Sequence, residues 1–236
     1  LIQSKIESGK DFTIVEIPYM YPKDIINNKN LKKIGYDPKL FTSSTLKKYF
    51  GGKFQLIPIK ENLVDLISSK YKKKVGMFFC LDHKFVGESA LSKVNRLAEK
   101  LKKNNSDSIF ISAPENVAWL LNIRGEDNPA SPIPNARLII DKKKNIYFFC
   151  NLKKAKNIKK KIKYKKIKFY SFEDFYSILL KLKASRFAID GLTCSIFYQG
   201  LIESKFEINE FEDPTYHLKS VKNKTEIKNM KTAHIK

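Results

Sequence analysis

The sequence predicts an α/β protein that contains two tandem copies of one type of domain. Short runs rich in β-branched residues alternate with segments of helical periodicity along most of the chain. One order, a strand, a Ser/Thr-capped helix and a strand, occurs twice with an offset of about 153 residues, which indicates tandem domains rather than a solenoid. The 236 residues are 42% hydrophobic and 12% aromatic, which is enough apolar material to fill real cores.

Residues 1–74 are expected to form the C-terminal part of the first domain. Their strand-like and helix-like stretches follow the order β-α-β-α-β-α. The helix that starts near Thr42 has the Ser and Thr residues that suit an N-cap. The expected elements are strands at 12–17, 32–37 and 54–59 and helices at 22–28, 42–50 and 61–67.

The second domain is expected to cover residues 84–213, after a charged join at 70–74. Its first helix begins after Ser89 and has one apolar stripe with a lysine-rich back. The stripe consists of Leu91, Val94, Leu97, Ala98 and Leu101. A strand at 108–112 follows this helix.

The stretch SAPENVAWLLNIRG, residues 112–125, combines helix-start chemistry, the single Trp of the chain and an Arg-Gly turn. Ser112 and Glu115 stand at capping-box spacing, and Pro114 lies in the first turn, where its missing N–H costs nothing. The apolar face of this helix consists of Val117, Ala118 and Leu121. The helix is expected to end near Asn122, and the polar loop NIRGEDNPASP that follows is the place where we expect function.

The rest of the second domain is predicted to alternate strands and helices. A β-hairpin is expected at 136–150, with its turn at 142–144. The lysine-rich run 153–168 has apolar residues at helical spacing and predicts an amphipathic helix with a solvated face. Ser171 is expected to cap a helix at 172–182. The remaining elements are strands at 167–171, 186–190 and 207–211 and a helix near 195–203.

Residues 214–236 are expected to start a third domain. Pro214 breaks the preceding strand, and Asn223 and Glu226 form a capping pair. Ile227, Met230 and His234 then follow at helical spacing, and the chain stops within that helix.

The repeat pairs the strand 34–37 and its capped helix with the strand 187–190 and the helix after it. Residues 12–17 correspond to 167–172 at about the same offset. The second copy has a hairpin and the motif helix at its start, and the first copy has neither. We therefore expect the first domain to be truncated at its N-terminus.

The net charge of +22 raises the question of an anionic partner. Of the 46 basic residues only four are arginines, so 42 are lysines, and they are spread along the whole chain. Phosphate-reading surfaces favour arginine, whose planar fork binds phosphate bidentately. We therefore expect no nucleic-acid partner. No apolar run approaches the roughly 20 residues of a membrane span, so no membrane partner is expected either.

The residues contain no recognisable catalytic set. His83, His217 and His234 have no neighbour at metal-ligand spacing, and GGK at 51–53 lacks the rest of a P-loop. No GxSxG nucleophile elbow occurs. The cysteines have no CxxC spacing and predict buried, reduced thiols in a cytoplasmic protein; they are Cys80, Cys150 and Cys194.

Several stretches resemble the aminopeptidase P (Xaa-Pro aminopeptidase) family, in the family's order. AWLLNIRGEDNPASPIPNARLII, residues 118–140, resembles the signature region of that family's second creatinase-like N-terminal domain. Residues 34–42 and 61–67 resemble the end of the first domain, and 83–103 resembles the start of the second. Residues 213–236 are similar to the lead-in of the catalytic "pita-bread" domain, of which this chain reaches only AHIK.

Two departures from the family pattern are mild. APENVAW stands where the family usually has an LDxIAW type of run, and Ser68 stands where a Trp is common. The resemblance otherwise extends over essentially all 236 residues.

The resemblance implies two tandem creatinase N-terminal-like domains, each a mixed sheet flanked by helices, in front of a catalytic domain. It implies a metallopeptidase that releases the N-terminal residue before proline, with two divalent ions, often manganese, bound by two Asp, one His and two Glu of the catalytic domain. We expect these ligands outside residues 1–236, so the fragment is expected to have no catalytic residues, to bind no metal and to be inactive. A homo-oligomer that acts on Xaa-Pro peptides through the missing domain is implied as well.

The N-terminal domains of such enzymes shape substrate access and subunit contacts, so the loop after Asn122 is expected to face the catalytic cleft. Arg124 offers either a carboxylate clamp for the peptide or an ion pair with Asp127. Trp119 forms either core or a wall of the substrate pocket. These three residues and Asn128 are the candidate substrate-access or interface residues.

Other functions remain open at this point. The chain is alternatively a non-catalytic creatinase-like interaction module, a prolidase- or creatinase-type relative, or a basic nucleic-acid binder, because fold alone does not determine function.

Overall fold

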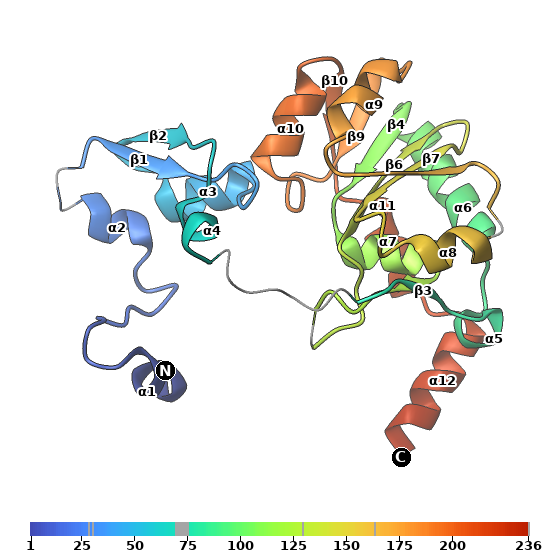
Figure 1. Cartoon of the computed structure of the whole chain (residues 1–236), viewed down its shortest axis with the longest axis horizontal. Helices are drawn as coiled ribbons and strands as arrows, with labels where there is room; N and C mark the ends of the chain where they lie inside the picture. Colours follow the sequence, from blue (N-terminus) through green and yellow to red (C-terminus); the bar gives the residue numbers. More distant parts are fainter. Residues whose placement is uncertain (28, 30, 69–75, 129, 163, 236) are drawn as a thin grey trace. The chain divides into compact units, whose positions relative to one another are not determined.

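The computed structural model describes residues 1–27, 29, 31–68, 76–128, 130–162 and 164–235. The chain forms two compact units, residues 1–69 and 70–236 (Figure 1). Both contain helices and parallel strand pairs, which confirms the predicted α/β class. No helix among the described residues has the length and apolarity needed for a membrane span.

The first unit, residues 1–69, is built around one pair of parallel strands. β1 (Lys33–Tyr36) pairs in parallel with β2 (Gln55–Pro58), and α3 (Ser43–Phe50) connects them. Thr42 caps α3 as predicted, because its hydroxyl accepts a hydrogen bond from the Thr45 amide at 3.2 Å. The other helices of this unit are α1 (Ile2–Ser8), α2 (Pro22–Asn27) and α4 (Leu63–Ser68).

The strand predicted at 12–17 is wrong. These residues form an irregular loop that runs into a turn at Ile17, and Phe12 and Ile17 are 72% and 52% exposed. No strand among the described residues pairs with this stretch, so its β-branched composition has no ladder to join. The predicted correspondence between 12–17 and 167–172 is wrong as well, because 167–170 forms a strand and 12–17 does not.

The second unit, residues 70–236, contains a six-stranded mixed sheet in the order β10-β9-β4-β6-β7-β8. β10, β9 and β4 run parallel, β6 is antiparallel to β4 and β7, and β8 is parallel to β7. The strands are β4 (Ser108–Ile111), β6 (Ala136–Asp141), β7 (Ile146–Cys150), β8 (Ile167–Tyr170), β9 (Arg186–Ile189) and β10 (Glu207–Glu210). The predicted hairpin at 136–150 is therefore confirmed.

Helices cover both faces of this sheet (Figure 1). On one face the core includes residues of α6 (Ala90–Lys103), α7 (Pro114–Leu121) and α8 (Lys156–Lys161). On the other face it includes residues of α9 (Phe175–Lys181) and α10 (Ile196–Glu203). All four residues of β4 are buried, because this strand lies inside the sheet and is covered on both sides.

The apolar stripe predicted for α6 needs one correction. Val94, Leu97, Ala98 and Leu101 are buried, but Leu91 is 53% exposed and Lys93 is only 1% exposed. The buried face of α6 therefore excludes Leu91 and includes Lys93. Ser89 caps α6 through a 3.2 Å hydrogen bond from the Ser92 amide.

Two predicted helix caps are also wrong. The Ser112 hydroxyl pairs with the Thr193 hydroxyl at 2.7 Å, so α7 begins after Ala113 without a side-chain cap. Ser171 donates its hydroxyl to the Asp174 carboxylate at 2.9 Å, and α9 begins only at Phe175. In both places the serine hydroxyl bonds to another side chain, Thr193 or Asp174, and not to a backbone N–H of the helix.

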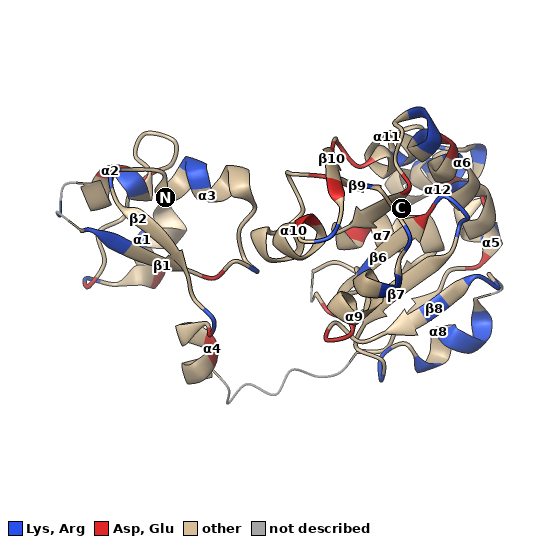
Figure 2. Ribbon diagram, turned by 90° about the horizontal axis from the view of Figure 1, so that it is seen from above, with Lys and Arg blue, Asp and Glu red and all other residues tan. Residues whose placement is uncertain are grey.

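The lysine-rich run forms a shorter helix than its periodicity predicts. α8 ends at Lys161, and β8 begins at Ile167. Ala155 and Ile158 of this run are buried, as its apolar spacing indicates. Figure 2 shows Lys and Arg on α3 as well as on α6 and α8, so the charge is spread over both units.

The repeated strand–helix–strand pattern has matching geometry in the two units. β1 and β9 start at Lys33 and Arg186 and α3 and α10 at Ser43 and Ile196, an offset of 153 residues in both cases. Both strand pairs are parallel. The aspartates that follow β1 and β9 make the same turn: the Lys39 amide donates to Asp37 Oδ1 at 2.8 Å and the Leu192 amide to Asp190 Oδ1 at 2.9 Å.

Three helices and two short strands complete the second unit. α5 (His83–Val86) precedes α6, and β3 (Phe79–Cys80) pairs antiparallel with β5 (Ile123–Arg124). α11 (Pro214–Ser220) and α12 (Lys224–Ile235) follow β10. The predicted Asn223–Glu226 capping pair is confirmed by two hydrogen bonds, from the Asn223 amide to Glu226 at 2.9 Å and from the Glu226 amide to Asn223 at 3.0 Å.

Asp107 connects three strands of the sheet and gives the protein an acid-sensitive contact. Its carboxylate accepts hydrogen bonds from the Lys142 ammonium at 2.6 Å and from the Ser185 amide at 2.8 Å. These donors lower the pKa of Asp107 to about 2. A lowered pKa in the folded state stabilises the fold above the ordinary pKa near 4, and this contribution is lost as the pH falls towards 2.

Asp107→Asn is expected to lower the free energy of unfolding at pH 7 by about 1 kcal/mol, a figure discounted because the ion pair is partly exposed. Urea unfolding at pH 7 and at pH 3 measures the effect, and the difference from the unmodified protein should shrink at pH 3. Glu207→Gln, in an exposed ion pair with Arg186, is the control and should change stability by less than about 0.5 kcal/mol at either pH. A difference that stays constant between the two pH values would contradict the prediction.

Candidate functional site at the end of helix α7

Helix α7 ends at a tight turn that leads directly to the candidate loop. Asn122, the C-cap residue, is in the left-handed conformation with φ 56°, which Asn tolerates better than most residues. The next two residues form β5, in which Arg124 lies opposite Phe79 of β3. The turn at Asn122 therefore sets the direction in which Arg124 leaves the helix.

Arg124 is half-buried, and its hydrogen bonds to the described residues are to backbone carbonyls. Its Nη1 donates to the Ala118 carbonyl at 3.2 Å and to the Ile123 carbonyl at 2.8 Å. Burial lowers the pKa of Arg124, and no ion pair links it to an acidic side chain of the described residues. A guanidinium has five N–H donors, so those that bond to no described residue are available to a carboxylate.

The predicted alternative of an ion pair between Arg124 and Asp127 is wrong. Asp127 pairs instead with the Lys154 ammonium, and its other oxygen accepts a hydrogen bond from the Asn135 amide at 2.6 Å. The loop folds back on itself at this point, so the Asp127 carboxylate faces the segment after β7 rather than β5.

Asn128 is exposed and shapes the loop through local bonds. Its side-chain oxygen accepts a hydrogen bond from the Ala130 amide at 3.1 Å, and its backbone forms an isolated antiparallel bridge with Ser131. The arrangement is an Asx turn, a usual role for Asn in a loop.

Trp119 is partly buried and packs against the core that lies beneath α7. Its indole N–H donates to Glu226 Oε1 of α12 at 3.2 Å. The indole therefore links the core of the second unit to α12.

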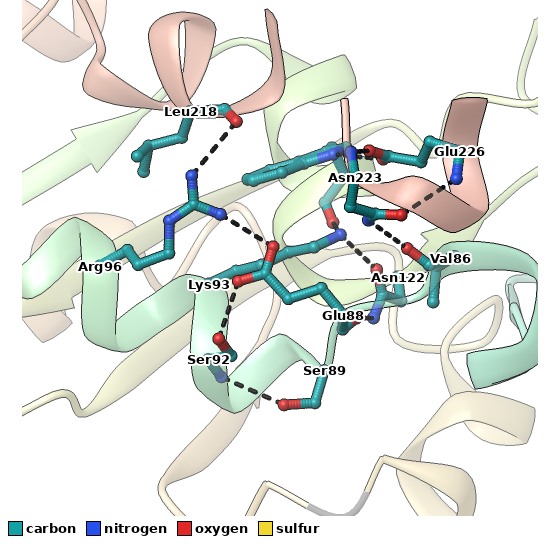
Figure 3. Close-up of polar contacts among 11 residues, drawn as sticks. Val86, Glu88, Ser89, Ser92, Lys93, Arg96, Asn122, Leu218, Asn223 and Glu226 are labelled. Atoms are coloured by element: carbon teal, nitrogen blue, oxygen red, sulfur yellow. Dashed lines mark hydrogen bonds and ion pairs between the residues drawn. The ribbon is translucent and has the colours of Figure 1, made fainter. Parts of the chain in front are cut away.

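Lys93 is the residue of this region that the sequence reasoning missed. Its ammonium donates to Asn122 Oδ1 at 2.7 Å (Figure 3). The same ammonium donates to the Trp119 carbonyl at 2.9 Å and lies 4.0 Å from the centre of the Trp119 ring. Desolvation lowers the pKa of Lys93 to about 8, against the opposing charges of Glu226 and Glu88. Its spacing of four residues from the buried Leu97 was a signal that this lysine faces inward.

The polar side chains around Lys93 form one connected network (Figure 3). The Glu88 carboxylate accepts from Arg96 at 2.8 Å and from the Ser92 hydroxyl at 2.8 Å. The Asn122 amide group donates to the Glu88 carbonyl at 2.8 Å, and that of Asn223 donates to a carbonyl of α5 at 2.8 Å. The network therefore joins the start of α6, the end of α7 and the start of α12.

The described residues do not fit a catalytic metal centre, because they contain no group of three or more His, Cys, Asp or Glu side chains placed to hold an ion. Cys150 and Cys194 are buried and Cys80 is partly buried, and all three are free thiols. Burial raises the pKa of the Cys150 and Cys194 thiols to about 12, so neither is an activated nucleophile.

The sequence profile described as Creatinase/Prolidase N-terminal domain matches residues 70–226, which is more than half of the chain. The chain belongs to this family. The match covers most of the second unit, including the six-stranded sheet, the NIRGED loop and the Lys93 network.

Relatives of this creatinase/prolidase N-terminal family member are longer proteins. A probable Xaa-Pro aminopeptidase P of Laccaria bicolor is 28% identical over 214 residues, which cover 86% of this chain and 33% of that protein. Xaa-Pro aminopeptidase 1 of Dictyostelium discoideum is 28% identical over 234 residues, which cover 89% of this chain and 35% of that protein. The chain thus spans about a third of the length of these relatives.

The fold has a counterpart among solved structures. The crystal structure of an X-prolyl aminopeptidase from Caenorhabditis elegans, described as a cytosolic enzyme with a di-nuclear active site, matches 93% of this chain and 38% of its own. The TM-score is 0.78 at 23% sequence identity. The two proteins share a fold over nearly the whole length of this chain.

Proposed function

We propose that the chain is the N-terminal region of an Xaa-Pro aminopeptidase, a metallopeptidase that releases the residue preceding proline. The observation that carries the proposal is the alignment of 86% of the chain with a third of a probable Xaa-Pro aminopeptidase P. The described residues hold no candidate metal centre. Two divalent ions, with manganese as the first candidate, would then be bound by a part of the polypeptide outside residues 1–236.

Within that enzyme the proposed role of the second unit is to shape substrate access. Arg124 is the residue proposed to meet the peptide, because its guanidinium is half-buried, anchored by two backbone carbonyls and without an acidic partner among the described side chains. Asp127 and Asn128 hold the loop in shape, and Trp119 supports it from the core side. The proposal also includes two tandem domains, as the matching strand–helix–strand units suggest, and a cytoplasmic homo-oligomer.

The test compares two purified proteins on an Xaa-Pro peptide in the presence of Mn²⁺. The full-length gene product is expected to release the N-terminal residue in a metal-dependent manner, and residues 1–236 alone are expected to show no cleavage above background. Metal-dependent cleavage by residues 1–236 would overturn the placement of the chemistry outside this chain. An inactive full-length protein that lacks the five metal ligands would favour a non-catalytic interaction module.

A further inference from the structure

Two cations bind the C-terminal carbonyls of α7. Arg124 bonds to the Ala118 carbonyl at 3.2 Å and Lys93 bonds to the Trp119 carbonyl at 2.9 Å. The last carbonyls of a helix carry its partial negative charge, so both cations are favoured there. The buried Lys93 and the proposed substrate-binding Arg124 therefore share one helix end.

Asn122 lies in the chain between these two carbonyls and Arg124, and its side chain makes two hydrogen bonds. Its Oδ1 accepts the Lys93 ammonium at 2.7 Å, and its Nδ2 donates to the Glu88 carbonyl at 2.8 Å. Its left-handed backbone, with φ 56°, costs a non-glycine residue energy unless the surroundings hold it. The Lys93 ammonium thus bonds to the residue that makes the turn before β5.

The same lysine connects this turn to α12. Its ammonium lies 4.0 Å from the centre of the Trp119 ring, whose N–H donates to Glu226 at 3.2 Å. Asn223 and Asn229 attach α12 to the Val86 and Phe85 carbonyls at 2.8 and 3.0 Å. Trp119 therefore contacts both Lys93 and α12.

We propose that Lys93 is a positioning residue for Arg124: it holds the Asn122 turn and links that turn through Trp119 to α12. The orientation of Arg124 then depends on the position of α12 relative to Trp119 and α5. This inference rests on the proposed function only where it assigns the peptide contact to Arg124. The turn itself and its link to α12 are properties of residues 70–236.

Trp119 is the single Trp of the chain, so its emission reports on this site alone. The charged groups that face Lys93 are Glu88 and Arg96 from the α6 side, Arg124 from β5 and Glu226 from α12. Burial lowers the pKa of Lys93 to about 8, and the ammonium is therefore lost between pH 7 and 9. Loss of the cation beside the indole should change the Trp119 emission over this range.

The experiment records Trp119 emission of the 236-residue chain from pH 6 to 9.5, together with amide hydrogen exchange. The unmodified chain should titrate with a midpoint near pH 8. Lys93→Met should abolish this titration and increase amide exchange at 122–125 roughly tenfold relative to the strands of the sheet. Lys102→Met, an exposed lysine of the same helix, is the control and should behave like the unmodified chain.

Asn122→Gly provides a second test should Lys93→Met unfold the protein. Glycine adopts the left-handed turn without strain but removes the side-chain acceptor of Lys93, which keeps the Trp119 carbonyl, so the emission midpoint should move while the fold persists. An unmoved emission midpoint in Asn122→Gly, or unchanged exchange at 122–125 in Lys93→Met, would overturn the inference. If both readouts behave as expected but KM of the full-length Lys93→Met enzyme is unchanged, the peptide-binding role of Arg124 fails and the positioning of the turn stands.

Discussion

Replacing Phe110 with alanine is expected to lower the free energy of unfolding of the second unit by about 3–5 kcal/mol. Phe110 lies on β4 in the middle of the sheet and is 1% exposed. Its ring centre is 5.1 Å from those of both Phe175 and Tyr198. Alanine would leave a cavity beside two aromatic rings that helices α9 and α10 hold in place, so little relaxation can fill it.

Urea unfolding followed by Trp119 emission measures this loss, because the single Trp lies in the second unit. Leu180→Ala on α9 is the control: Leu180 is 54% exposed, and its truncation should cost less than about 1 kcal/mol. A loss below about 1 kcal/mol for Phe110→Ala would mean that the sheet is not packed on its α9–α10 face as described.

The second large effect concerns Arg124 in the proposed full-length Xaa-Pro aminopeptidase. Arg124→Ala should raise KM for an Xaa-Pro peptide roughly 10- to 100-fold, because a hydrogen bond to a charged group contributes about 1.5–3 kcal/mol. The guanidinium is held by two carbonyls at 3.2 and 2.8 Å and has no acidic partner in the described part of the chain, so its free donors face no competing carboxylate there. Steady-state kinetics with a single Xaa-Pro substrate gives KM and kcat separately.

Arg186→Ala is the matched control, since Arg186 forms an exposed ion pair with Glu207 at the start of β9. Its KM should equal that of the unmodified enzyme. Unchanged kinetics with a lowered melting temperature for Arg124→Ala would show instead that this arginine only braces the end of α7.

Local sequence patterns predicted several elements whose interacting residues are close in sequence. The Thr42 cap of α3 and the Asn223–Glu226 pair of α12 were both predicted and both form. The hairpin at 136–150 was predicted for the same reason, because adjacent strands pair through a short turn. The offset of 153 residues between β1 and β9 was visible as a pattern of strand, capped helix and strand.

Several of the wrong predictions involve partners distant in sequence, although the Ser171 cap fails because of Asp174, three residues away. Ser112 bonds to Thr193, 81 residues away, and so leaves α7 uncapped. Residues 12–17 have strand-like composition but no strand among the described residues to pair with. Asp127 pairs with Lys154, 27 residues away, instead of with its near neighbour Arg124.

The sequence by itself determined the α/β class, most helices and strands of the second unit, the resemblance that proved to be family membership, and the position of the NIRGED loop. These properties follow from hydrophobic periodicity, turn residues and short-range pairs, which depend on neighbouring residues alone. Only the tertiary structure decided that Lys93 is buried beneath Trp119, that Arg124 is left without an acidic partner among the described side chains, and that α12 bonds to the same indole. The physical reason is that the charge state and hydrogen-bond partners of a side chain depend on which distant elements cover it, and no local pattern contains that information.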